Sequence, residues 1–169
     1  MQYTSAQAAK ILRRLNEERS ALLTMENQSK DFLASVGEDP ETVRPDYDYA
    51  ATQAKLRELE EKIRKVKHAI SMFNISTVVP EFGMTVDQLL VYIPQLSQRK
   101  VKYADMMSKL PKTRETGGAY ARGNIIDYRY ANYDISAAEQ DHSWVSDTLG
   151  RAQTALDVIN NTLTMEIEL

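Results

Sequence analysis

Four long stretches of the chain repeat apolar residues at alternating intervals of three and four, and this repeat restricts the chain to long amphipathic helices. Such spacing places the apolar side chains on one stripe of a helix. The predicted helices cover residues 5–32, 49–74, 85–110 and 136–163. Their stripes are Ala8, Ile11, Leu15, Glu18, Leu22, Met25, Ser29 and Phe32; Leu56, Leu59, Ile63, Val66, Ile70 and Phe73; Val86, Leu89, Ile93, Leu96, Tyr103, Met107 and Leu110; and Ala138, His142, Val145, Leu149, Ala152, Leu156, Ile159 and Leu163.

Three of the helix starts carry a capping box, in which a Ser or Thr is followed three residues later by Glu or Gln. The pairs are Thr4 with Gln7, Thr85 with Gln88, and Ser136 with Glu139. Four helices with medium-length connectors predict an all-α fold, an antiparallel bundle of four main helices. A length of 169 residues fits a single domain covering residues 1–169.

Proline and glycine interrupt the helical pattern at several points. Residues 36–48 form an acidic connector, and we expect mobile loops near 36–48 and 111–123. Pro94 lies inside the third helix, where it predicts either a kink near Leu90 or a new helix that begins at Pro94. Pro111 ends that element in both cases.

Residues 124–130 change from the helical period to strict alternation, which is the strand signal of this chain. Ile126, Tyr128 and Tyr130 then share one face. A lone strand leaves backbone groups unpaired. The strand is therefore expected to form a hairpin through Ala131-Asn132, to pair with residues 164–168, or to pair with a second copy of the chain.

Motifs for catalysis or cofactor binding are missing from the sequence. There is no cysteine, no Gly-x-Ser-x-Gly and no glycine-rich phosphate loop. Glu139 and His142 have the Glu-x-x-His spacing of di-iron bundles, but His68 has Lys65 in place of the second Glu. We predict no catalytic, cofactor-binding or metal-binding residue. The sequence thus favours a protein that is not an enzyme. Glu18, Ser29 and Lys100 interrupt the stripes, which favours polar residues that fix helix register.

Charge is distributed unevenly along the chain. Residues 97–130 hold eight basic and three acidic residues, whereas residues 131–169 hold one basic and seven acidic. Attraction between the two segments, within the fold or between subunits, is the simplest interpretation. Basic and aromatic side chains alternate in the first segment, which gives nucleic-acid binding as an alternative; they are Arg99, Lys100, Lys102, Tyr103, Lys109, Lys112, Arg114, Tyr120, Arg122, Tyr128, Arg129 and Tyr130.

The N-terminal residues Met1–Ser5 lack the basic and apolar pattern of a signal peptide. No apolar run approaches the roughly 20 residues that span a bilayer. A cysteine-free chain fits a reducing compartment, so we expect a cytoplasmic protein.

Several segments of the second half resemble a small bacterial family called septicolysin-like. Ile70-Ser71-Met72-Phe73-Asn74 keeps the first and last residues of a family segment at the end of the second helix. Residues 132–138 are similar to the family's entry into its last helix, and residues 161–166 resemble its C-terminal segment without the Trp. The resemblance implies a short helical protein without an agreed biochemical role, and the family label implies membrane activity.

The leading expectation for function is a non-enzymatic interaction or structural protein that forms a homo-oligomer or binds a protein partner. Association would cover surplus apolar surface and satisfy strand edges. Cytolysin-like membrane action is the alternative that the resemblance supplies, and nucleic-acid binding through residues 97–130 is the third.

Overall fold

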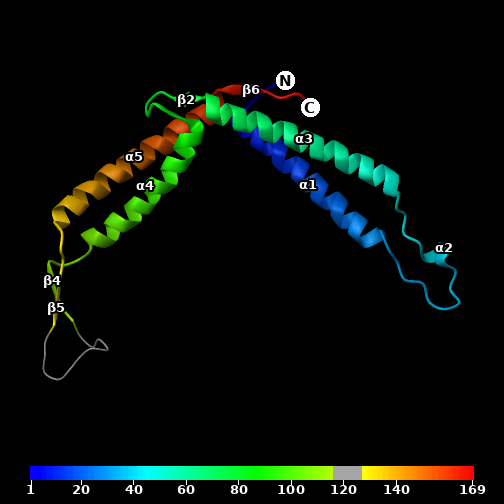
Figure 1. Cartoon of the computed structure of the whole chain (residues 1–169), viewed down its shortest axis with the longest axis horizontal. Helices are drawn as coiled ribbons and strands as arrows, with labels where there is room; N and C mark the ends of the chain where they lie inside the picture. The colour runs from blue at the N-terminus through cyan, green and yellow to red at the C-terminus, as the bar shows by residue number, and fades with distance from the viewer. Residues whose placement is uncertain (116–126) are drawn as a thin grey trace. The chain divides into compact units, whose positions relative to one another are not determined.

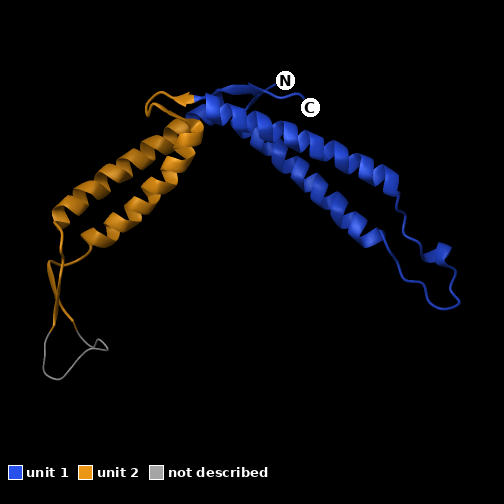
Figure 2. Ribbon diagram, viewed as in Figure 1, with its two compact units in different colours: residues 1–77, 158–169 blue, residues 78–157 orange. Residues whose placement is uncertain are grey.

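The computed structural model is mostly helical, with small antiparallel sheets, and it describes residues 1–115 and 127–169. The chain divides into two compact units, each containing two long helices (Figures 1 and 2). Unit 1 comprises residues 1–77 and 158–169, and unit 2 comprises residues 78–157. The prediction of long amphipathic helices is confirmed, while their union in one four-helix bundle and one domain stays a prediction.

Unit 1 begins and ends with a strand. Strand β1 (Gln2–Thr4) pairs antiparallel with β6 (Thr164–Glu166), so that Tyr3 lies opposite Met165. Met1 and Ile167 extend this pairing by two backbone hydrogen bonds. The Met1 N-terminus donates to the Ile167 carbonyl at 3.2 Å, and the Ile167 N–H donates to the Met1 carbonyl at 3.0 Å. Met165 and Ile167 are buried beneath this sheet. The expected pairing of residues 164–168 with the strand near 124–130 is therefore wrong, and the N-terminal strand takes that place.

Between these strands run two long helices, α1 (Ser5–Ser29) and α3 (Tyr49–Ser76), which pack against each other. The capping box at Thr4 and Gln7 is present as predicted, and the Asp48 carboxylate caps α3. Five of the six predicted stripe residues of α3 are buried, and Ile70 is half-buried. The short helix α2 (Pro40–Val43) lies in the segment that joins α1 to α3.

The predicted stripe of α1 is wrong at two positions. Glu18 and Met25 are exposed, whereas Arg19 and Glu26 are half-buried. A strict seven-residue repeat drifts by about 20° per heptad around a straight helix. Toward the C-terminal end of α1, the residues that face α3 are therefore one position later than predicted, at Arg19 and Glu26. The inner face there is consequently polar.

Unit 2 opens with a short hairpin of β2 (Val78–Val79) and β3 (Met84–Thr85). Gly83 turns this hairpin with a φ of 61°, a left-handed conformation that favours glycine. Helix α4 (Val86–Met107) follows, with the predicted capping box at Thr85 and Gln88. It continues through Pro94, so the alternative of a new helix at Pro94 is wrong. The helix ends four residues before Pro111.

The last helix, α5 (Ile135–Thr162), runs beside α4 (Figure 2). The Asp134 carboxylate accepts a hydrogen bond from the Ser136 N–H at 2.8 Å, so Asp134 caps this helix and the predicted cap at Ser136 is wrong. The predicted stripe is correct for the residues that form the core of unit 2 and the end of the helix: Ala138, Val145, Leu149, Ala152 and Ile159 are buried. Leu163 lies beyond the helix end and is exposed.

The segment between α4 and α5 contains a second hairpin. Strand β4 (Lys112–Arg114) pairs antiparallel with β5 (Tyr128–Tyr130), with Thr113 opposite Arg129. This corrects the expected loop at residues 112–114 and the two expected pairings of residues 128–130 within the chain, whereas pairing with a second copy stays a prediction. Residues 116–126, which include part of that predicted loop and strand, lie outside the described residues.

Candidate interaction surfaces

The acidic connector predicted from the sequence forms a folded loop in unit 1, and we refer to residues 31–48 as the acidic loop. It joins the end of α1 to the start of α3 (Figure 1). The loop holds six acidic residues and one basic residue, which gives a net charge of −5. A compact loop of this charge is a surface with a strong local potential.

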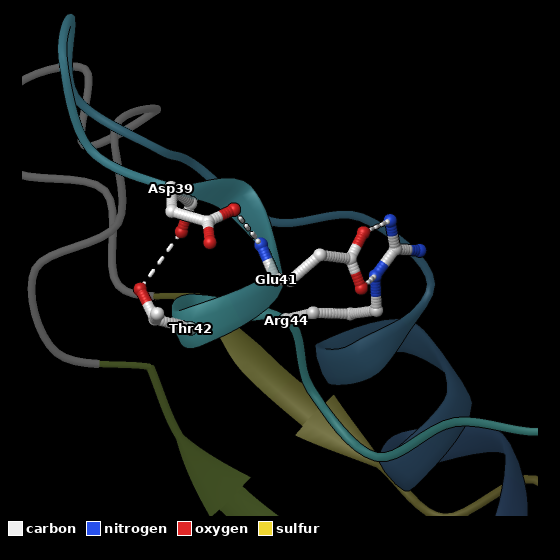
Figure 3. Close-up of polar contacts among 4 residues, drawn as sticks. All are labelled: Asp39, Glu41, Thr42 and Arg44. Carbon is white, nitrogen blue, oxygen red and sulfur yellow. Dashed lines mark hydrogen bonds and ion pairs between the residues drawn. The ribbon is translucent and has the colours of Figure 1, made fainter.

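Hydrogen bonds within the loop fix its backbone. The Asp39 carboxylate accepts from the Glu41 N–H at 3.0 Å and caps α2, and the Thr42 hydroxyl donates to the Asp39 carbonyl at 2.7 Å. Figure 3 shows both bonds, together with the two that Arg44 donates to Glu41 at 3.0 and 2.6 Å. One turn earlier, the Ser35 N–H donates to the Glu38 carboxylate at 3.0 Å. The loop's own side chains thus hydrogen-bond to its backbone and to one another, and its mobility stays a prediction.

Tyr47 joins the loop to α1, and Arg44 packs on Phe32 within the loop. Arg44 lies over the Phe32 ring at 5.4 Å from its centroid. The Tyr47 hydroxyl donates to the Glu26 carboxylate at 2.7 Å, and the Gln53 amide donates to the same oxygen at 2.6 Å. The hydrogen bond to Glu26 raises the pKa of Tyr47 above its ordinary value of 10.0. Glu26 thus links the end of α1, the loop and the start of α3.

Leu33 and Val36 are the apolar side chains that this loop leaves in solvent. Leu33 is 96% exposed and Val36 is fully exposed. Gly37 follows with a φ of 91° and turns the backbone there. The loop thus displays two apolar residues within a strongly acidic surface, which is the chemistry of an interaction site with a polar rim.

The corresponding surface of unit 2 is basic and aromatic. We refer to residues 109–115 and 127–130 as the basic hairpin; they hold four basic and two acidic residues. The Lys112 ammonium lies over the rings of Tyr128 and Tyr130, at 4.1 and 5.4 Å from the centroids. Both rings remain exposed. Arg129 is paired with Glu115, and Lys109 with Asp105 at 2.6 Å.

A groove of about 350 Å³ lies beside the basic hairpin. Its apolar wall is formed by Met106, Leu110, Tyr130 and Tyr133, and the Tyr133 hydroxyl donates to the Met106 carbonyl at 2.8 Å. A second groove, of about 520 Å³, lies in unit 1 between the end of α3 and β6, with His68, Met72 and Leu163 in its lining.

The residues that the sequence singled out elsewhere are dispersed. His142 is half-buried on α5, Glu139 is exposed, and His68 lies in the other unit. Within residues 1–115 and 127–169, no group of three metal-ligating side chains occurs. Ser29 and Lys100 are half-buried, whereas Glu18 is exposed. Tyr120 and Arg122 of the basic segment lie outside the described residues.

Sequence reasoning missed most of the surface just described. The acidic character of residues 36–48 was visible, but the exposure of Leu33 and Val36 was not, because a sequence does not state which apolar residues lie off the core. Phe32 was expected on the helical stripe and instead lies just beyond α1, under Arg44. The pairing of Lys112 with two tyrosines depends on the strand register, which the sequence did not reveal.

Comparison with known proteins identifies a fold and no family. No family model and no curated protein match the sequence. The structure is similar to the crystal structure of a functionally unknown conserved protein from Corynebacterium diphtheriae, with a TM-score of 0.63 and 16% sequence identity. The match covers 98% of this chain and 100% of the other. The resemblance to the septicolysin-like family stays a prediction. No helix among the described residues is long and apolar enough to cross a membrane.

Proposed function

We propose that this chain is a non-enzymatic interaction protein that self-associates in the cytoplasm. The observation that carries the proposal is the exposure of Leu33 and Val36 on the acidic loop. Scattered apolar residues are common on protein surfaces. Here two of them stand three positions apart on a segment that its own hydrogen bonds hold in place.

A partner that covers Leu33 and Val36 would gain binding free energy by removing their apolar surface from water. Covering apolar surface contributes about 25 cal/mol per Å². A preformed loop also loses little conformational freedom on binding, so more of that gain remains as affinity. Both factors favour a docking role for the acidic loop over a role as a linker.

The test is multi-angle light scattering on a size-exclusion column at micromolar concentration. Wild-type protein is expected as a defined oligomer, with a mass above the 19.2 kDa of one chain. The Leu33→Ser/Val36→Ser variant is expected to shift toward the single-chain mass. Ile75→Ser/Val158→Ser serves as a control, because Ile75 and Val158 are also exposed apolar residues of unit 1 but lie outside the acidic loop. A wild-type monomer would contradict self-association.

Nucleic-acid binding is a second candidate, and the basic hairpin is the observation that favours it. Lys112 and Arg114 are exposed beside two exposed tyrosine rings, a combination suited to phosphate contact and base stacking. This candidate predicts that fluorescence anisotropy of a labelled oligonucleotide rises at low salt and falls steeply as salt is added. Unchanged anisotropy at low salt would exclude it.

A further inference from the structure

We infer that the surface which binds the acidic loop is the basic hairpin of a second copy of the same chain. The inference rests on the proposed self-association and names the two surfaces that make the contact. It follows from three features of the described residues: opposite charge, free charged groups on both sides, and exposed apolar or aromatic side chains on both sides.

Charge complementarity is the first feature. The acidic loop has a net charge of −5, and the basic hairpin has a net charge of +2, from four basic and two acidic residues. Complementary potentials accelerate encounter and suppress contact between like surfaces. Two acidic loops, or two basic hairpins, would repel each other. The favourable contact between copies is therefore loop to hairpin.

The availability of these charges is the second feature. Within residues 1–115 and 127–169, no ion pair is formed by Asp31 or Asp46 of the loop, nor by Lys112 or Arg114 of the hairpin. Glu41 and Arg129, by contrast, are already paired with Arg44 and Glu115. The unpaired groups are the ones that a second copy can neutralise without breaking a bond inside either chain.

The uncharged parts of the two surfaces also match. The loop offers Leu33 and Val36, and the hairpin offers the rings of Tyr128 and Tyr130. Aromatic residues are enriched at the centres of protein interfaces, where they pack against aliphatic side chains. Lys112, already stacked on both rings, holds a positive charge next to that apolar contact. A central apolar contact with a charged rim results.

Paired charge reversals test the inference in the full-length chain. The acid-reversed variant is Asp31→Lys/Asp46→Lys, and the base-reversed variant is Lys112→Glu/Arg114→Glu. The residues of the acid-reversed variant accept no hydrogen bond in the described part of the chain, so the loop fold is retained. The matched control is Arg57→Glu/Lys67→Glu, which reverses two exposed charges on α3. Circular dichroism melting confirms that each variant is folded.

The expected result is a reciprocal pattern in sedimentation equilibrium. Each reversed variant alone associates at least about tenfold more weakly than wild type, because the acid reversal lowers the loop charge from −5 to −1 and the base reversal changes the hairpin charge from +2 to −2. An equimolar mixture of the two variants regains association, since the unchanged loop of the base-reversed chain (−5) meets the unchanged hairpin of the acid-reversed chain (+2). The control pair associates like wild type.

The outcomes separate this inference from the proposed function. A wild-type monomer overturns both. A wild-type oligomer whose mass both reversed variants retain overturns only the loop-to-hairpin contact. Failure of the mixture to reassociate overturns it as well. If the base-reversed variant loses oligonucleotide binding but keeps its oligomeric mass, the hairpin is a nucleic-acid site and the inference is wrong.

Discussion

The two helix pairs of this protein are held together in different ways. In unit 2 the core consists of apolar residues such as Leu89, Leu96 and Val145, each with almost no exposed surface. In unit 1 the apolar core includes Ala8 and Leu15 of α1 and Leu56 and Leu59 of α3, but polar contacts join it farther along α1. There Arg19 donates to Glu60 at 2.9 Å, and Glu26 accepts from Tyr47 and Gln53.

This difference has a consequence for the acidic loop. Polar contacts are directional, and they contribute less net stability than apolar burial of the same size. The end of unit 1 next to the loop therefore combines apolar burial by Leu56 and Leu59 with directional polar contacts at Arg19 and Glu26. An interaction surface needs such an arrangement, because the side chains must be positioned while the apolar ones remain uncovered.

The largest expected effect tests the apolar core of unit 2. Leu96→Ala removes a fully buried side chain and should lower the free energy of unfolding by about 2–5 kcal/mol. Leu90→Ala is the matched control, since Leu90 lies on the same helix and is 43% exposed. Chemical denaturation measures both. Equal losses in the two variants would show that the apolar core is misassigned.

The next effect concerns the start of α5. Asp134→Ala removes the carboxylate that accepts the Ser136 N–H, and it should cost about 1 kcal/mol of unfolding free energy. Ser136→Ala should cost less, because the Ser136 side chain is not the cap. The same denaturation experiment compares the two variants. A larger loss in Ser136→Ala than in Asp134→Ala would show that Ser136 is the cap, as the sequence pattern predicted.

These two positions illustrate how far the sequence leads. The buried parts of the α4 and α5 stripes were predictable because apolar burial follows the helical period, whereas Met107 and Leu110 at the end of the predicted α4 stripe are exposed. The Thr4 and Thr85 caps were predictable because a capping box is local. Asp134 was missed since two residues, Asp134 and Ser136, both have side chains that could serve as the cap. The partner of Tyr128–Tyr130 was missed since three-residue strands carry almost no periodic signal, and their pairing is decided by contacts distant in sequence.

The polar contact between α1 and α3 should contribute less than either change above. Arg19→Met exchanges a partly exposed ion pair with Glu60 for apolar contact, and the unfolding free energy should change by less than about 1 kcal/mol. The measurement is denaturation at low and high salt. A loss of several kcal/mol would mean that unit 1 depends on this ion pair and that the contrast between the two units is wrong.

The smallest effect is a pKa shift at the base of the acidic loop. Glu26→Gln removes the negative acceptor that raises the pKa of Tyr47, so this pKa should fall toward 10.0. A raised pKa in the folded state stabilises the fold below the unfolded-state pKa, and the contribution is lost as pH rises through the folded-state pKa. The variant should therefore show a weaker decline of stability above pH 10.0. Because the chain has nine tyrosines, an NMR titration that follows the assigned Tyr47 ring resonance gives this pKa, and an unchanged value would contradict the contact.

The contact between the acidic loop and the basic hairpin can be measured most directly by paramagnetic relaxation between copies. Because the chain contains no cysteine, Ser35→Cys introduces a single attachment site for a spin label in the loop. Spin-labelled, isotopically unlabelled chains are mixed with unmodified ¹⁵N-labelled chains, so any broadening arises between copies. The account predicts broadening of the amides of residues 112–114 and 128–130. Broadening confined to other residues, or none while the protein is oligomeric, would contradict it.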